Sequence, residues 1–144
     1  MNLFKSRRQR FKEARTPIAN EAFIAALHTA DADVLGMLAV RQAMGSSLHV
    51  PFEYILPDEP LPSLLSLGGE SWDMVGFIMG LEEALGVEIP DKLAARCPLP
   101  YVGRFFETLS PAPRDFGTWA TDVVNFMRDE GICHQVPGPS SQVL

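Results

Sequence analysis

One serine stands where the sequence offers the clearest chance of chemistry. Ser71 follows two glycines, Gly68 and Gly69, in the stretch GGESWDMVGFIMGLEEALGVEIPD, and it opens a long apolar and acidic run. Glycines let the chain turn sharply and leave a hydroxyl exposed. Serine is also among the best N-cap residues of a helix. Ser71 therefore either caps the helix that follows it or carries a group at that point.

A metal centre is not indicated by the cysteines and histidines. Cys133 and His134 are adjacent, but Cys97, His28 and His49 lie far from them in the sequence. Zinc sites need four ligands at characteristic short spacings, which this pattern lacks. We therefore expect no metal site.

Acid–base or hydrolytic catalysis is not favoured either. Glu82 and Glu83 are neighbours, and neighbours on a helix point about 100° apart, so a solvated face is the better interpretation. No base stands in a recognisable relation to Ser71, and no nucleophile-elbow pattern surrounds it. We expect a protein that is not an enzyme.

Length, charge and cysteine usage narrow the class further. The 144 residues suit one domain, 47% of them are hydrophobic, and the net charge is −6. Residues 1–15 hold six basic side chains and one acidic, whereas residues 16–110 hold thirteen acidic and four basic. This distribution predicts docking to basic protein surfaces rather than to nucleic acid. No apolar run approaches the ~20 residues of a membrane span. Two cysteines do not make a disulfide framework, so a reducing, cytoplasmic location fits best.

Helical periodicity predicts the elements that position Ser71. Proline-rich residues 51–67 are apolar enough to lie on a core as a long loop, and residues 1–15 predict a frayed helix or a disordered arm. Asn20, and Asp31 or Asp33, are the expected N-caps, and Gly45 and Gly86 the expected helix ends. No strand-like alternation is present. The predicted helices cover residues 17–31, 31–47, 71–86, 99–109 and 114–131.

Each of the two clearest helices carries an apolar stripe, from which we predict its buried face. Gly76 and Gly80, four residues apart on the first helix, indicate either close helix packing, which we favour, or a smooth exposed face. The predicted stripes are Met74, Val75, Ile78, Leu81 and Leu85 on the first helix, and Phe116, Trp119, Val123, Phe126 and Met127 on the second.

The run from Ser71 to Asp91 resembles the acyl carrier proteins, which are small helical bundles. Their signature is a serine in an Asp-Ser-Leu context before an acidic helix that ends in a Leu-Glu-Glu…Ile-Pro-Asp run. The likeness covers residues 31–110 and is strongest at 67–91. The matching residues are Ser71, Asp73, Val75, Met79, Leu81, Glu82, Glu83, Glu88, Ile89, Pro90 and Asp91.

The resemblance implies a function for Ser71. In the family this serine carries 4′-phosphopantetheine, whose thiol holds acyl groups as thioesters. A phosphodiester is favoured at a helix N-terminus, where N–H groups and the helix dipole face it. The resemblance also implies that Val75, Ile78 and Met79 line an interior that shelters the cargo. The residues implied in partner recognition are Glu70, Trp72, Asp73, Glu82 and Glu83.

The sequence also departs from the family pattern. Glu70 replaces an aspartate, Trp72 replaces a leucine, and Gly76 stands where an acid is common. Trp72 is expected either to cover the bundle as a lid or to anchor a partner.

The sequence thus predicts an all-α bundle of four to five helices. Residues 1–18 form a basic arm, residues 19–110 a carrier-like domain, and residues 111–144 an additional helix with a flexible tail. The expected function is an acyl carrier in lipid or secondary-metabolite biosynthesis, served by a phosphopantetheinyl transferase and by acyl-transfer or synthase enzymes with basic docking surfaces. The first alternative is an unmodified module that docks on a partner protein through its acidic helix. The second is a membrane-peripheral regulator that uses residues 1–15.

Overall fold

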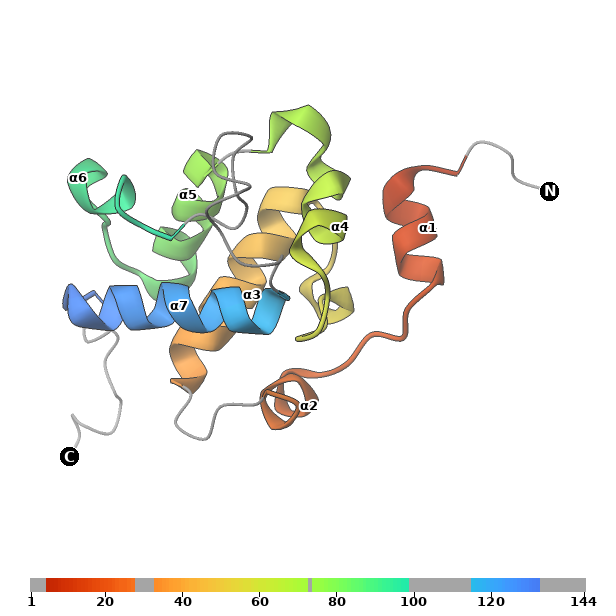
Figure 1. The fold of residues 1–144 in the computed structure, drawn as a ribbon, viewed down its shortest axis with the longest axis horizontal. Coiled ribbons are helices and arrows are strands. Elements are labelled where there is room, and N and C mark those ends of the chain that lie inside the picture. Colours follow the sequence, from red (N-terminus) through yellow and green to blue (C-terminus); the bar gives the residue numbers. More distant parts are fainter. Residues whose placement is uncertain (1–4, 28–32, 73, 99–114, 133–144) are drawn as a thin grey trace, which may run out of the picture.

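The structure is a computed structural model, in which residues 5–27, 33–72, 74–98 and 115–132 are described. The regular secondary structure of these residues is helical, which confirms the predicted all-α class (Figure 1). Seven α-helices and two 3-10 helices occur in this part of the chain, with no strand beyond a single bridge between Pro60 and Asp115. The elements are α1 (Arg7–Glu13), α2 (Asn20–Ala25), α3 (Val34–Leu48), η1 (Phe52–Tyr54), α4 (Leu61–Leu65), η2 (Ser66–Ser71), α5 (Met74–Leu85), α6 (Asp91–Ala94) and α7 (Phe116–Asp129).

Short helices explain why the structure has more helices than the four to five that the sequence predicts. Pro60 and Pro90 precede α4 and α6, and both segments fold into single turns that sequence periodicity is too short to reveal. The predicted loop at 51–67 lies on the core as expected, because its apolar side chains Ile55, Leu61, Leu64 and Leu67 are buried. The predicted helix at 99–109 and the predicted tail lie outside the described residues.

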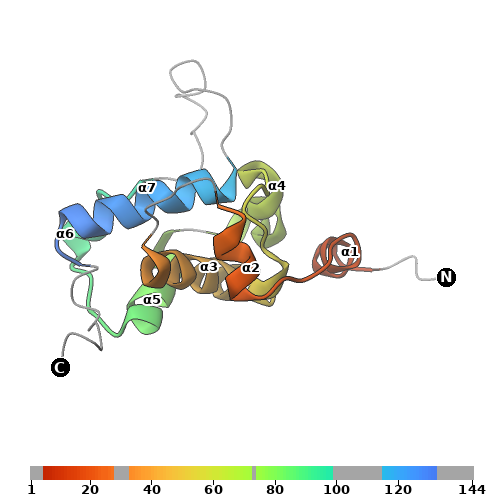
Figure 2. The same ribbon diagram turned by 90° about the horizontal axis from the view of Figure 1, so that it is seen from below.

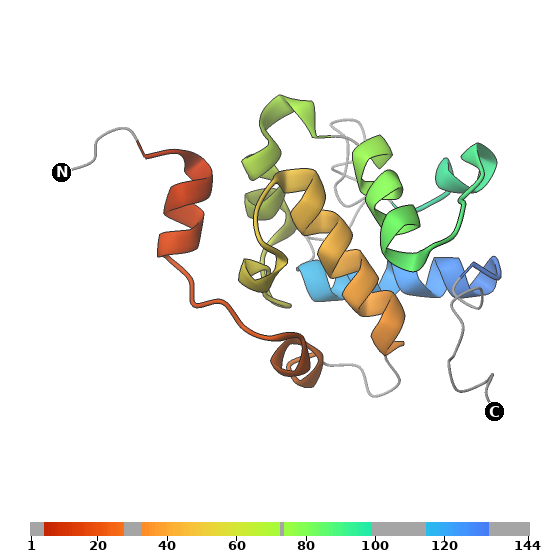
Figure 3. The same cartoon turned by 180° about the vertical axis from the view of Figure 1, so that it is seen from behind.

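Helix α3 packs against both α5 and α7. Figure 2 shows α7 along one side and α3 with α5 along the other, and Figure 3 shows α3 and α5 side by side in front of α7. Small residues allow these close approaches. A Cβ at Gly80 would lie 3.2 Å from Ala43 Cα, and one at Gly36 would lie 3.1 Å from Val124 Cγ1. The predicted packing role of Gly80 is therefore confirmed.

An aromatic cluster fills the space between α7 and the other helices. Phe77 and Trp119 have ring centroids 5.1 Å apart, and Phe116 lies 6.0 Å from Trp119 and 6.1 Å from Phe23. Most of the predicted α7 stripe is buried, with Phe126 partly so. Because this stripe contacts the main core, α7 packs as part of the helical bundle.

The ends of α2 and α3 differ in part from the predicted caps. Asp33 caps α3 as predicted, since its Oδ1 accepts a hydrogen bond from the Gly36 N–H at 2.9 Å. Asn20 is wrong as a cap, because it is the first residue of α2 and its side chain turns to Arg41. Gly45 does not end α3, which continues to Leu48; a Cβ there would lie 2.9 Å from the Val50 carbonyl oxygen, so its smallness serves packing.

Arg41 is a fully buried charge inside α3. It stacks on Phe23, with the guanidinium carbon 4.4 Å from the ring centroid. Burial lowers its pKa to about 10, and Glu53 opposes that shift, so the group stays charged at neutral pH. Its donors reach the carbonyl oxygens of Ile18, Glu53 and Ile55 and the side-chain oxygen of Asn20, at 2.9–3.2 Å.

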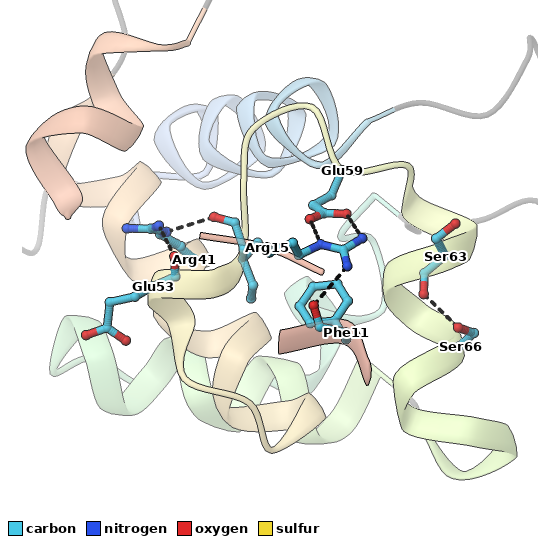
Figure 4. Close-up of polar contacts among 8 residues, drawn as sticks. Phe11, Arg15, Arg41, Glu53, Glu59, Ser63 and Ser66 are labelled. Carbon is cyan, nitrogen blue, oxygen red and sulfur yellow. Dashed lines mark hydrogen bonds and ion pairs between the residues drawn. The ribbon is translucent and has the colours of Figure 1, made fainter. Parts of the chain in front are cut away.

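The basic N-terminal segment folds as α1 and is attached to the body. Ser6 caps the helix through its hydroxyl, and Phe11 is only 7% exposed. Arg15 forms a two-pronged ion pair with the buried carboxylate of Glu59 and lies over the Phe11 ring at 3.7 Å (Figure 4). The sequence predicts either a frayed helix or a disordered arm for residues 1–15. Residues 7–13 form a helix.

Candidate functional site

Ser71 lies between two helices rather than at the cap of one. It is the last residue of η2, Trp72 is extended with φ −70° and ψ 134°, and α5 begins only at Met74. Ser71 is therefore not the N-cap of α5, and that interpretation of the serine is wrong. The reason is local: the Ser66–Ser71 stretch closes into 3-10 turns before the chain extends. The side chains of Glu70 and Ser71, and all of Asp73, lie outside the described structure.

Trp72 rests on the bundle immediately after the candidate serine. Its Nε1–H donates a hydrogen bond to Ser47 Oγ on α3 at 2.8 Å, and the side chain is half-buried. A Cβ at Gly68 would lie 2.6 Å from Trp72 Cβ, so only glycine permits this contact. Of the two roles open to Trp72, this geometry matches the lid.

The exposed face of α5 is more apolar than predicted. Val75 is 65% exposed and Met79 61% exposed, so the expectation that they line an interior is wrong. Phe77 is fully buried instead, together with Ile78, as predicted for the latter. The buried stripe of Phe77, Ile78, Leu81 and Leu85 is rotated about the helix axis relative to the predicted one. Val75 and Met79, four residues apart, share the opposite face.

The two neighbouring carboxylates on α5 have different roles. Glu83 is exposed, whereas Glu82 is half-buried and its Oε2 accepts a hydrogen bond from the Ile89 N–H at 2.7 Å. The Glu82 carbonyl also accepts from Gly86, which ends α5 with φ 69° as predicted. Glu82 therefore stabilises the chain reversal after α5, and Glu83 is the carboxylate turned to solvent.

A groove of about 650 Å³ runs between α3 and α5 beside the exposed α5 face. Sequence reasoning missed the contribution of α3, although Ser46, Ser47 and His49 mark the end of that helix as a polar stretch. The groove is lined by Ser46, Ser47, His49, Gly76, Met79, Gly80, Glu82 and Glu83. Ser47 also bonds to Trp72, so the groove adjoins the segment that carries Ser71.

Other reactive groups do not extend this site. Cys97 is buried, and burial raises its pKa to about 12, which leaves the thiol protonated and unreactive at neutral pH. Within the described ranges, no three His, Cys, Asp or Glu side chains gather as metal ligands would. No helix there is both long and apolar enough to span a bilayer.

Comparisons with known proteins return nothing for this chain. No protein-family model matches it, and neither the curated proteins nor the solved structures contain a match.

Proposed function

We propose that the protein is a carrier that holds an acyl or related group as a thioester on 4′-phosphopantetheine attached to Ser71. The observation that carries the proposal is the exposed face of α5, where Val75, Met79 and Glu83 follow closely after the serine. Exposed apolar side chains beside a carboxylate suit a surface that partner proteins contact repeatedly. The resemblance of the sequence from Ser71 to Asp91 supplies the chemistry.

The partners in this proposal have basic docking surfaces. A net charge of −6 and the exposed Glu83 attract such surfaces and speed encounters that remain reversible. A phosphopantetheinyl transferase is the first partner, and acyl-transfer or synthase enzymes follow. In the first step the Ser71 hydroxyl oxygen attacks the phosphorus of coenzyme A that bears the pantetheine. The bond from that phosphorus to adenosine bisphosphate breaks, and the hydroxyl proton passes to a base of the transferase.

Intact mass is the direct test. Protein purified from its own cells, or made with a phosphopantetheinyl transferase of broad specificity, gains one phosphopantetheinyl group. Ser71→Ala abolishes the gain, whereas Ser63→Ala, at an exposed serine on α4, leaves it unchanged. Protein from its own cells that lacks the group on Ser71 would overturn the proposal and leave the unmodified docking module in its place.

The α5 face is tested separately by removing its apolar side chains. Met79→Ser slows transfer of the group to Ser71, because the transferase loses an exposed apolar contact. Leu35→Ser is the matched control, since Leu35 is 50% exposed on α3. Equal rates for the two variants would show that the α5 face does not serve docking.

A further inference from the structure

The segment that carries Ser71, residues 66–72, is attached to α3 through its last residue, Trp72. Trp72 follows the serine directly, and its indole N–H bonds to Ser47 Oγ at 2.8 Å. Ser47 Oγ in turn donates to the Met44 carbonyl at 2.9 Å, so its hydroxyl is oriented with the acceptor side towards the indole. The Trp72 side chain also covers Gly68, in the middle of η2. The chain on both sides of Ser71 is thereby tied to one helix.

Helix α1 holds the same segment at the segment's first residue, Ser66. Arg7 Nη1 donates to the carbonyl oxygen of Ser66, the first residue of η2, at 3.0 Å. Arg8 Nε donates to the carbonyl oxygen of Leu48, the last residue of α3, at 2.7 Å. Two consecutive arginines of α1 thus join η2 to the end of α3, next to Ser47. Cations are favoured at the C-terminal carbonyls of a helix, which stabilises the Arg8 contact.

A further contact closes the arrangement. The Leu48 side chain lies 3.3 Å from where a Cβ at Gly68 would stand, so η2 packs on the end of α3 as well as bonding to it through α1. Arg7, Ser47 and Leu48 contact the stretch from Ser66 to Trp72 directly. Arg8 instead holds α1 against the end of α3. Arg10, on the same helix, is exposed like Arg7, but its side chain makes no hydrogen bond within the described residues.

We propose that Ser47, Arg7 and Arg8 are positioning residues for Ser71, and that together with Trp72 they form a clamp that holds Ser66–Trp72 in one conformation. The value of this clamp for arm transfer rests on the proposed function, but the clamp itself does not. Its role is to hold the backbone that carries Ser71 in a fixed place before α5. This assigns the basic N-terminal helix an intramolecular task in addition to any contact with partners.

Amide hydrogen exchange of a peptide covering residues 66–72 tests the clamp in the full-length protein. Ser47→Ala and Arg7→Gln each remove a direct hydrogen bond to this peptide, and Arg8→Gln releases α1 from the end of α3. Each change raises exchange of the peptide about fivefold, the value that corresponds to loss of one net hydrogen bond. Gln42→Ala on the exposed face of α3 and Arg10→Gln on α1 are the matched controls and leave it unchanged. Ser47→Thr keeps the hydroxyl and restores slow exchange. Exchange that is equal in Ser47→Ala, Arg7→Gln, Arg8→Gln and the controls would overturn the proposal.

Transfer kinetics separate this inference from the proposed function. In protein that accepts the arm, Ser47→Ala lowers kcat for its transfer and leaves KM for coenzyme A unchanged, because the serine is mispositioned while the coenzyme still binds the transferase. A kcat equal to that of Gln42→Ala would show that the clamp does not position the hydroxyl. If wild-type protein accepts no arm, the proposed function fails, and the exchange measurement still decides whether the clamp exists.

Discussion

Helices α1 and α7 are the first and last helices of the described chain, but they are attached in different ways. Helix α7 contributes Phe116 and Trp119 to the central aromatic cluster and buries most of one face. Helix α1 buries Phe11 and is otherwise held by arginines that reach carbonyl oxygens and the Glu59 carboxylate. One helix is therefore held by apolar area, and the other by a few directional contacts.

The largest effect is expected where α7 enters the core. Trp119→Ala lowers the free energy of unfolding by ~3–5 kcal/mol, because Trp119 is 1% exposed and its Nε1–H donates to the Pro98 carbonyl. Chemical denaturation of the variant and of Thr118→Ala, at the exposed neighbouring position, measures the difference. A loss below ~1 kcal/mol would mean that α7 is peripheral after all.

A smaller effect is expected for the ion pair that holds α1. Arg15→Ala lowers the free energy of unfolding by ~1–3 kcal/mol, because the Glu59 carboxylate, 4% exposed, loses its partner. Adding Glu59→Gln to this variant recovers part of the loss, since the buried charge disappears. Thermal melts of both variants, with Lys12→Ala as control, check the effect; an unchanged melting temperature for Arg15→Ala would mean that α1 is a dispensable arm.

The rate at which the Cys97 thiol is alkylated distinguishes the α7 region from the α1 region. Its raised pKa of about 12 keeps the thiol protonated at pH 8, so alkylation of a Cys133→Ser background is slow until the protein unfolds. Trp119→Ala speeds alkylation several-fold, because Trp119 bonds to the neighbouring Pro98, whereas Arg15→Ala does not. Equal rates in the two variants would contradict a separation of the regions.

The raised pKa of Cys97 also makes the free energy of unfolding depend on pH. The folded pKa of Cys97 lies above 9.0, the ordinary value of a cysteine thiol, so the folded state binds the proton more tightly. Its stabilising contribution is complete below about pH 9 and is lost as the pH rises towards 12. Cys97→Ala removes this part of the decline, and denaturation curves at pH 8 and pH 10 measure the difference.

The smallest effect is expected at the candidate site itself. Because Ser71 does not cap α5, Ser71→Ala loses no N-cap bond of ~1 kcal/mol, and the free energy of unfolding changes by less than ~0.5 kcal/mol. Denaturation curves of the unmodified proteins check this. A loss above ~1 kcal/mol would indicate a capping bond by the hydroxyl.

Local sequence pattern was sufficient for the parts of the fold that depend on neighbouring residues. The α7 stripe, the Asp33 cap and the Gly86 ending follow from periodicity and cap chemistry, and all are confirmed. The burial of Phe77 in place of Val75 was not predictable, because both are apolar and only the neighbouring helices decide which one faces them. The attachment of α1 depends on a carboxylate 44 residues away from Arg15, which no local pattern reveals.

In the candidate site too, some residues were identifiable from the local sequence and others were not. Ser71 and the acidic helix after it were identifiable from the run of residues, whereas their supports were not. Ser47 reaches Trp72 across 25 positions, and Arg7 reaches Ser66 across 59. Arg41 did leave a signal, since it is a lone charge within an apolar helical stretch, and such a charge needs buried partners.

Arg41 has a consequence for how the protein folds. Its acceptors belong to two segments, residues 18–20 and 53–55, which reach it from opposite directions along the chain. A state with only one of them docked would leave a buried guanidinium with too few acceptors, and that costs several kcal/mol. Partly assembled forms are therefore penalised, and the two segments dock and undock together. The Arg41 side chain thus makes folding and unfolding around α3 cooperative.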